Sequence, residues 1–208
     1  TAAIAERLWS NENITDMTSL RKRMSVISLQ LEELGITHIR NKEVLLRNIS
    51  NNQTNTALED FSNICEPLKV YSRNNEGTEY KTYSPFTLFA DACTPDAKDA
   101  LGFDAAVNHY LKNKNSENQL LVTDYLKKWI NVNAKLIELS SNAPLIQPLL
   151  PLSKSLSDLS QQLILRIEKK QTLNPSNLNN LLEQCNSKNH ADVELAVFNS
   201  LKKLVSAE

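Results

Sequence analysis

The chain of 208 residues carries 23 Lys and Arg against 24 Asp and Glu, a formal net charge of −1. This balance argues against nucleic acid or an anionic membrane as the main partner, because both are recognised through clustered positive charge. Three Gly and 41% hydrophobic residues favour long helices over a sheet with many tight turns, and no apolar run approaches the roughly 20 residues that span a bilayer.

Two helices are predicted at the start of the chain. Residues 1–8 are rich in Ala and free of helix breakers. Residues 16–34 have Asp16 as a candidate N-cap and Gly35 at the left-handed position that ends a helix. The apolar residues of this second helix recur at steps of three and four: Leu20, Met24, Ile27, Leu31 and Leu34. A chain rarely begins inside a helix with no initiator Met, so we expect a fragment of a longer protein.

A family resemblance starts at the same residues. The run Ala5-Glu6-Arg7-Leu8-Trp9-Ser10, followed by a helix with Leu20, Arg23 and Leu34-Gly35-Ile36, resembles the end of the catalytic barrel in family 20 glycoside hydrolases, the β-N-acetylhexosaminidases. The resemblance covers residues 1–49. Residues 57–208 resemble, more weakly, a helical C-terminal extension found on some bacterial members.

The resemblance implies a parent enzyme whose chemistry lies elsewhere. In this family an Asp-Glu pair at the top of a (β/α)₈ barrel acts on the sugar, and the substrate's own acetamido group is the nucleophile. That pair and the pocket tryptophans lie upstream of the matched segment. No residue of this chain therefore inherits a catalytic role.

Glu6, Arg7 and Trp9 are interpreted as structural residues. In the family they would sit on a late barrel helix and the turn after it, away from the mouth where barrel chemistry occurs. We expect an ion pair or cap with a packed indole, and a contact to sugar is the alternative.

The middle of the chain is less regular. Residues 41–49 predict a short helix, and the polar tract 50–56 is the best linker candidate. A further helix over residues 57–65 is stopped by Pro67.

Residues 68–84 lose helical periodicity around the turn-rich Asn74-Asn75-Glu76-Gly77, which predicts a small hairpin or an ordered loop. A tyrosine combines an apolar ring with a hydrogen-bonding tip. The candidate substrate contacts are Tyr71, Arg73, Tyr80 and Tyr83. The alternative is a loop pinned to its own domain by its tyrosines.

Ser84-Pro85 and Thr94-Pro95 each place a capping hydroxyl before a proline, which predicts two helix starts. The second helix would run through Leu101, Val107, Tyr110 and Leu111. Asp96 and Asp99 would lie in its first turn, where the helix dipole favours negative charge, so we do not interpret them as an acid and base pair.

Four helices are predicted after residue 116. Ser116-Glu117-Asn118-Gln119 has the pattern of a capping box. The apolar seams are Val122, Tyr125, Trp129, Val132, Leu136 and Leu139; then Leu152, Leu156, Leu159, Leu163 and Ile167; then Leu178, Leu181, Leu182 and Cys185; and finally Val193, Val197, Leu201 and Leu204. Four such helices with short connections predict an antiparallel bundle.

Cysteine and histidine offer no recognisable site. Cys65, Cys93 and Cys185 are widely spaced and predict buried thiols, with one disulfide and a free thiol as the alternative. The three His are scattered, so we expect no metal and no cofactor.

The sequence therefore predicts an all-α chain: two remnant barrel helices (1–49), a loop-rich bridge (57–113) and a four-helix bundle (116–208), the last two forming the C-terminal domain 57–208. We expect this portion of a β-N-acetylhexosaminidase to be catalytically inert, although its parent would release terminal N-acetylhexosamine from glycans or chito-oligosaccharides. The alternative is a helical interaction or oligomerisation module with no enzymatic parent. The expected partners are the parent barrel and a second copy of the chain, with no nucleic acid and no membrane. A periplasmic or secreted location is favoured over the cytoplasm.

Overall fold

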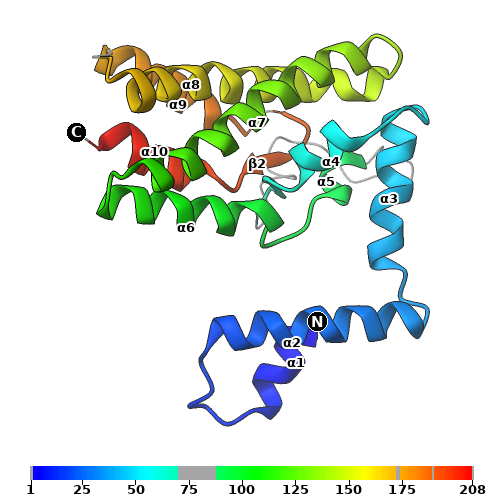
Figure 1. Ribbon diagram of the computed structural model, residues 1–208. Helices are drawn as coiled ribbons and strands as arrows, with labels where there is room; N and C mark the ends of the chain where they lie inside the picture. Colours follow the sequence, from blue (N-terminus) through cyan, green and yellow to red (C-terminus); the bar gives the residue numbers. More distant parts are fainter. Residues whose placement is uncertain (1, 70–87, 172–173, 189, 208) are drawn as a thin grey trace. The chain divides into compact units, whose positions relative to one another are not determined.

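The computed structural model describes residues 2–69, 88–171, 174–188 and 190–207. These residues form helices and one small two-stranded sheet (Figure 1). The predicted all-α class is confirmed. The chain divides into two compact units, Thr1–Val44 and Leu45–Glu208.

The first unit contains α1 (Ala2–Trp9), α2 (Met17–Glu33) and the start of α3 (His38–Ile49). Asp16 caps α2, because its carboxylate accepts hydrogen bonds from the backbone N–H of Thr18 at 2.9 Å and of Ser19 at 3.2 Å. Gly35 has a φ of 90°, a conformation that glycine adopts without strain. Both predicted ends of this helix are thus confirmed.

The second unit contains the remaining elements. In chain order they are α4 (Thr56–Ser62), β1 (Cys65–Pro67), α5 (Leu88–Ala92), α6 (Lys98–Lys112), α7 (Ser116–Ser140), the 3₁₀ helix η1 (Pro144–Leu149), α8 (Leu150–Lys169), α9 (Pro175–Cys185), β2 (Val193–Leu195) and α10 (Phe198–Ser206).

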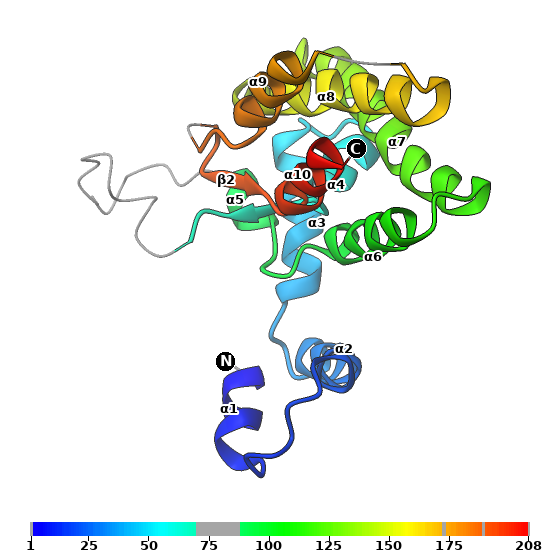
Figure 2. The ribbon, with the colours of Figure 1, turned by 90° about the vertical axis from the view of Figure 1, so that its left-hand side faces the viewer.

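Five helices of this unit pack in a closed circuit. α6 contacts α7, α7 packs along α8, α8 contacts α9, α9 contacts α10, and α10 returns to α6 (Figures 1 and 2). α4 packs against α7. The core between these helices contains most of the predicted seam residues, among them Val122, Trp129, Leu136, Leu156, Leu163 and Leu201. The helices of the loop-rich stretch 57–113 therefore share one core with those of 116–208.

The last predicted seam is wrong at its start. Val193 lies in β2, which pairs antiparallel with β1, so that Cys65 faces Leu195 and Pro67 faces Val193. Val193 and Leu195 are buried and Glu194 is half-buried, which is the alternation of a strand with one covered face. The spacing from Val193 to Val197 fits a helix as well, and the ladder to β1 decides between the two.

Two predicted helix starts are shifted. α6 begins at Lys98 rather than at Thr94-Pro95, and Asp96 precedes it with a φ of 59°. Tertiary hydrogen bonds fix this later start, because Ala97 N–H donates to a carboxylate oxygen of Glu66 at 3.2 Å. α7 is capped by Asn115, whose side chain accepts from Asn118 N–H at 2.8 Å, rather than by Ser116.

Two other predictions concern the segments 70–87 and 50–56. Ser84-Pro85 and the predicted hairpin fall within residues 70–87, outside the described residues. The linker candidate 50–56 lies within the second unit rather than between two units. Ser50 is fully buried there, and its hydroxyl donates to the carbonyls of Arg47 and Gln53 at 3.2 and 3.1 Å.

Cys65, Cys93 and Cys185 are buried thiols, as predicted. Across the described ranges no three His, Cys, Asp or Glu side chains gather in a way that could hold a metal ion. No helix in the described part of the chain has both the length and the apolar character needed to cross a bilayer.

Candidate functional site

The four predicted substrate contacts belong to one segment of the chain. Tyr71, Arg73, Tyr80 and Tyr83 all fall within residues 70–87, which lie outside the described residues. Their role stays a prediction.

Glu6 joins the first two helices. Arg23 of α2 donates from Nε to Glu6 Oε2 at 3.3 Å and from Nη2 to Glu6 Oε1. The hydrogen bonds from Arg23 lower the pKa of the Glu6 carboxyl, and the same bonds raise the pKa of Arg23. The ion pair is a link between helices of the first unit.

Arg7 holds the loop that follows α1. Its Nη1 donates to the carbonyl of Ile14 at 3.1 Å, and its Nη2 donates to the carbonyl of Glu12 at 3.0 Å. The planar guanidinium suits this double task because its donors form a rigid fork.

Trp9 is 91% exposed, so the first unit provides no packing for its indole, and the expected packing stays a prediction. Two other apolar residues of α1, Ile4 and Leu8, are 66% and 78% exposed. Neither α1 nor α2 contains a buried residue. Two short helices in contact are too small to enclose an indole, so its cover would have to come from outside this unit.

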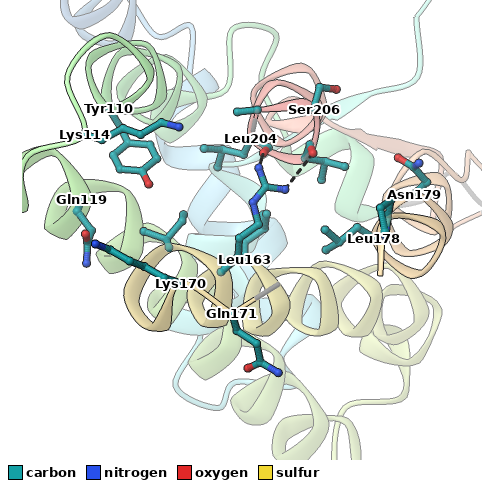
Figure 3. A pocket seen from close by; sticks show the side chains of 15 residues that line it. Tyr110, Lys114, Gln119, Leu163, Lys170, Gln171, Leu178, Asn179, Leu204 and Ser206 are labelled. Atoms are coloured by element: carbon teal, nitrogen blue, oxygen red, sulfur yellow. Dashed lines mark hydrogen bonds between the residues drawn. The ribbon is translucent and has the colours of Figure 1, made fainter. Parts of the chain in front are cut away.

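A cavity of about 780 Å³ lies at one end of the helical circuit in the second unit (Figure 3). Its size is within the range of small-molecule sites. The ends of α6, α8 and α10 meet the starts of α7 and α9 there. The residues that line it are Tyr110, Lys114, Gln119, Leu163, Arg166, Ile167, Lys170, Gln171, Pro175, Leu178, Asn179, Leu204, Val205, Ser206 and Ala207.

Arg166 of α8 lines this cavity. Its Nη1 donates to the carbonyl of Val205 at 3.0 Å, and its Nη2 donates to the carbonyl of Leu204 at 2.8 Å (Figure 3). These carbonyls belong to the last turn of α10, where the helix itself provides no donor. Arg166 therefore caps α10 with a half-buried guanidinium.

Tyr110 directs its hydroxyl toward the cavity from the end of α6 (Figure 3). Partial burial raises the pKa of Tyr110, although the charge of Arg166 opposes that shift. The phenol therefore stays protonated at neutral pH and can donate a hydrogen bond to a ligand.

Sequence patterns indicated the helices of this cavity but not the cavity. Tyr110 was predicted on a helix, and Leu163, Ile167, Leu178 and Leu204 were predicted as seam residues. Arg166 and Lys170 gave no signal of their own, because basic residues near the end of a helix are common where they offset its dipole.

No protein-family model matches the chain, and no curated protein matches it. Among solved structures, the chain is similar to the chitobiase of Flavobacterium johnsoniae, determined by X-ray crystallography and assigned to family 20 of the glycoside hydrolases. The two share 62% sequence identity with a TM-score of 0.94. The match covers 99% of this chain and 31% of that chain.

The chain resembles a C-terminal fragment of a family 20 glycoside hydrolase. The family resemblance predicted from the first 49 residues is thereby confirmed. Because the match covers 99% of the chain, it includes the second unit as well as the first. The helices around the cavity are therefore part of the segment shared with the chitobiase, and the chain spans less than a third of that protein's length.

Proposed function

We propose that the chain is the non-catalytic C-terminal part of a β-N-acetylhexosaminidase. In this proposal residues 1–49 complete a catalytic barrel, and residues 57–208 form a helical C-terminal domain. The rest of the enzyme would release terminal N-acetylhexosamine from glycans or chito-oligosaccharides. The observation that carries the proposal is the 62% identity to a chitobiase over 31% of its length.

Three carboxylates of the first unit support an inert role. Asp16 caps a helix, and Glu6 is held by Arg23. Glu32 accepts hydrogen bonds from the backbone N–H of Arg40 at 3.0 Å and of Ile39, and these bonds lower its pKa. A general acid of a glycosidase needs a raised pKa so that it is protonated at the working pH. The pKa of Glu6 and of Glu32 is shifted the opposite way.

An assay with a chromogenic N-acetylglucosaminide tests the proposal. The purified chain of 208 residues should release no chromophore above a buffer blank. A longer protein that carries the preceding segment of the same gene should do so. Turnover of the chromogenic substrate by the chain of 208 residues would refute the inert role. A longer protein without glycosidase activity would refute the assignment of the parent enzyme.

The first unit supports a second proposal, that its apolar faces are covered by the parent barrel and, in the isolated chain, by a second copy. The most exposed of its apolar residues are Ile4, Leu8, Trp9, Ile14, Met17, Val26, Leu29, Leu34 and Ile36. Contiguous exposed apolar surface usually marks an interface. The isolated chain would then self-associate through these apolar residues, and the association would need neither nucleic acid nor a membrane.

Light scattering after size-exclusion chromatography tests this interface. Leu8→Glu should shift the chain toward a monomer, whereas Ile137→Glu is the matched control, because Ile137 is 51% exposed in the second unit. A monomeric mass for the unmodified chain at micromolar concentration would contradict the proposal. If the longer protein still associated through Leu8, the alternative of an interaction module without an enzymatic parent would be favoured.

We also propose a periplasmic or secreted location, by analogy with the chitobiase. Fractionation of cells that produce the full-length protein tests this. Recovery in the cytoplasmic fraction alone would contradict it.

A further inference from the structure

The cavity at the end of the helical circuit is positively charged. Lys114, Arg166 and Lys170 line it, and among the described residues that line it there is no Asp or Glu. Both terminal nitrogens of Arg166 bond neutral carbonyls. Its charge, like that of Lys170, is balanced by no carboxylate within ion-pair distance in the described part of the chain.

Among the described residues no carboxylate pairs with this half-buried guanidinium, and burying a charge costs free energy unless an opposite charge compensates it. Two backbone carbonyls satisfy the hydrogen bonds of Arg166 but carry only partial charge. The positive potential is therefore open to a ligand from the cavity side.

The floor of the cavity is apolar. Leu163, Leu178 and Leu204 close it from beneath and are exposed by no more than 3%. The apolar surface that a ligand can reach is therefore provided by Pro175, which is exposed, and by Val205, which is half-buried. The polar groups stand around this floor, where Tyr110 offers a phenolic hydroxyl and Asn179 an amide (Figure 3). A ligand that fits this arrangement has an anionic head and an apolar body.

We propose that this cavity binds an amphipathic oxyanion, a phosphate or carboxylate carried on an apolar group. The oxyanion contacts Arg166 and Lys170 and accepts a hydrogen bond from the Tyr110 hydroxyl, while the apolar body lies on Pro175 and Val205. Charge-assisted hydrogen bonds of this kind are the strong ones. A neutral sugar fits less well, because Tyr110 is the sole aromatic side chain among the described lining residues and the charges of Arg166 and Lys170 would have no anionic partner. This inference does not depend on the proposed enzymatic parent.

Three probes separate the head from the body. Phenyl phosphate carries both, inorganic phosphate carries the charge alone, and phenol carries the ring alone. Titration of the full chain by ¹H–¹⁵N NMR should show saturable binding of phenyl phosphate. Its dissociation constant should be about tenfold lower than that of inorganic phosphate or of phenol. The shifted amides should lie at Arg166, Lys170 and Leu178.

Two variants assign the contact. Lys170→Gln removes one positive charge. Lys170 has a φ of 50°, so a substitution by Gly would also relieve backbone strain, whereas Gln leaves that strain unchanged. Lys169→Gln is the matched control, since Lys169 is an exposed neighbour that does not line the cavity. We expect Lys170→Gln to weaken phenyl phosphate binding about fivefold, the effect of one nearby charge in water, and Tyr110→Phe to weaken it without changing the affinity for phenol.

Four results would overturn the inference. They are no binding of phenyl phosphate at millimolar concentration, equal affinity for phenol, shifts that map away from the cavity, and equal losses in Lys170→Gln and Lys169→Gln. The last result would show attraction by net charge alone. Unfolding curves of each variant separate a lost contact from a lost fold.

Discussion

Lys203 of α10 donates a hydrogen bond to Asp104 Oδ1 of α6 at 2.7 Å, and Ser200 donates to the same oxygen at 2.7 Å. Asn108, one turn along α6, donates to Asp104 Oδ2 at 2.8 Å and accepts from Lys203 at 3.0 Å. This network closes the helical circuit, because it fastens the last helix to the first one of the five.

Removal of the network should destabilise the second unit modestly. Asp104 and Lys203 side chains are 43% and 42% exposed, so solvent screens the ion pair and much of the effect comes from the hydrogen bonds. Asp104→Ala should lower the free energy of unfolding by about 1 kcal/mol. Urea unfolding followed by circular dichroism measures this, and Asp124→Ala, an exposed carboxylate on α7, is the control.

The contribution of Asp104 should depend on pH. The hydrogen bond from Lys203 lowers the pKa of the Asp104 carboxyl in the folded chain, below its unfolded value of about 3.9. Its stabilising effect is therefore complete above about pH 4 and is lost as the pH falls through the folded pKa. The difference in unfolding free energy between the unmodified chain and Asp104→Asn should shrink on acidification. A difference that stays constant with pH would contradict an ionic role.

Gly102 of α6 permits the close approach of Tyr125 from α7. A Cβ added at Gly102 would lie 2.5 Å from the Tyr125 hydroxyl oxygen and 3.6 Å from its Cζ. Gly102→Ala should lower the free energy of unfolding by about 1 to 2 kcal/mol through overpacking, in spite of the better helix propensity of Ala.

The same substitution should change sign when the hydroxyl is absent. In the Tyr125→Phe background the remaining contact of 3.6 Å is ordinary, so Gly102→Ala should raise the free energy of unfolding by up to about 1 kcal/mol. Urea unfolding of the four proteins in this double-mutant cycle measures the coupling. Equal effects of Gly102→Ala in both backgrounds would show that the hydroxyl does not cause the clash.

Helices whose signals are local could be predicted from the sequence. The cap at Asp16, the seam behind it and Gly35 all belong to one stretch, and Asn174 likewise caps α9 by accepting from Ser176 N–H at 2.9 Å. The pairing of β1 with β2 could not be predicted, because each strand has three residues and its partner lies far away in the sequence.

The cavity was beyond sequence reasoning for a related reason. The partners of Arg166 are two backbone carbonyls of another helix. Every residue has a backbone carbonyl, so the sequence does not indicate which ones will accept a hydrogen bond from Arg166. Trp9 shows the converse, since its residue type predicts burial but the surface that would cover it is absent from the first unit.

The three thiols should be unreactive in the folded chain. Burial raises the pKa of the Cys185 thiol to about 12 and that of Cys65 well above its usual range, and the reactive species is the thiolate. A disulfide reagent at about pH 8 should therefore label none of the three natively and all three in urea. Ser25→Cys, at an exposed position of α2, gives the positive control. Rapid native labelling of the unmodified chain would show that the core opens locally.

Arg7 should control the loop between α1 and α2. Its guanidinium binds the carbonyls of Glu12 and Ile14 at once, which a lysine ammonium cannot do with the same geometry. Arg7→Lys should therefore increase amide hydrogen exchange and proteolysis within residues 10–16, with little change in the second unit. Arg47→Lys, at an exposed position of α3, is the control. Unchanged protection of the loop in Arg7→Lys would show that the loop is held by other contacts, and the structural role assigned to Arg7 would then be wrong.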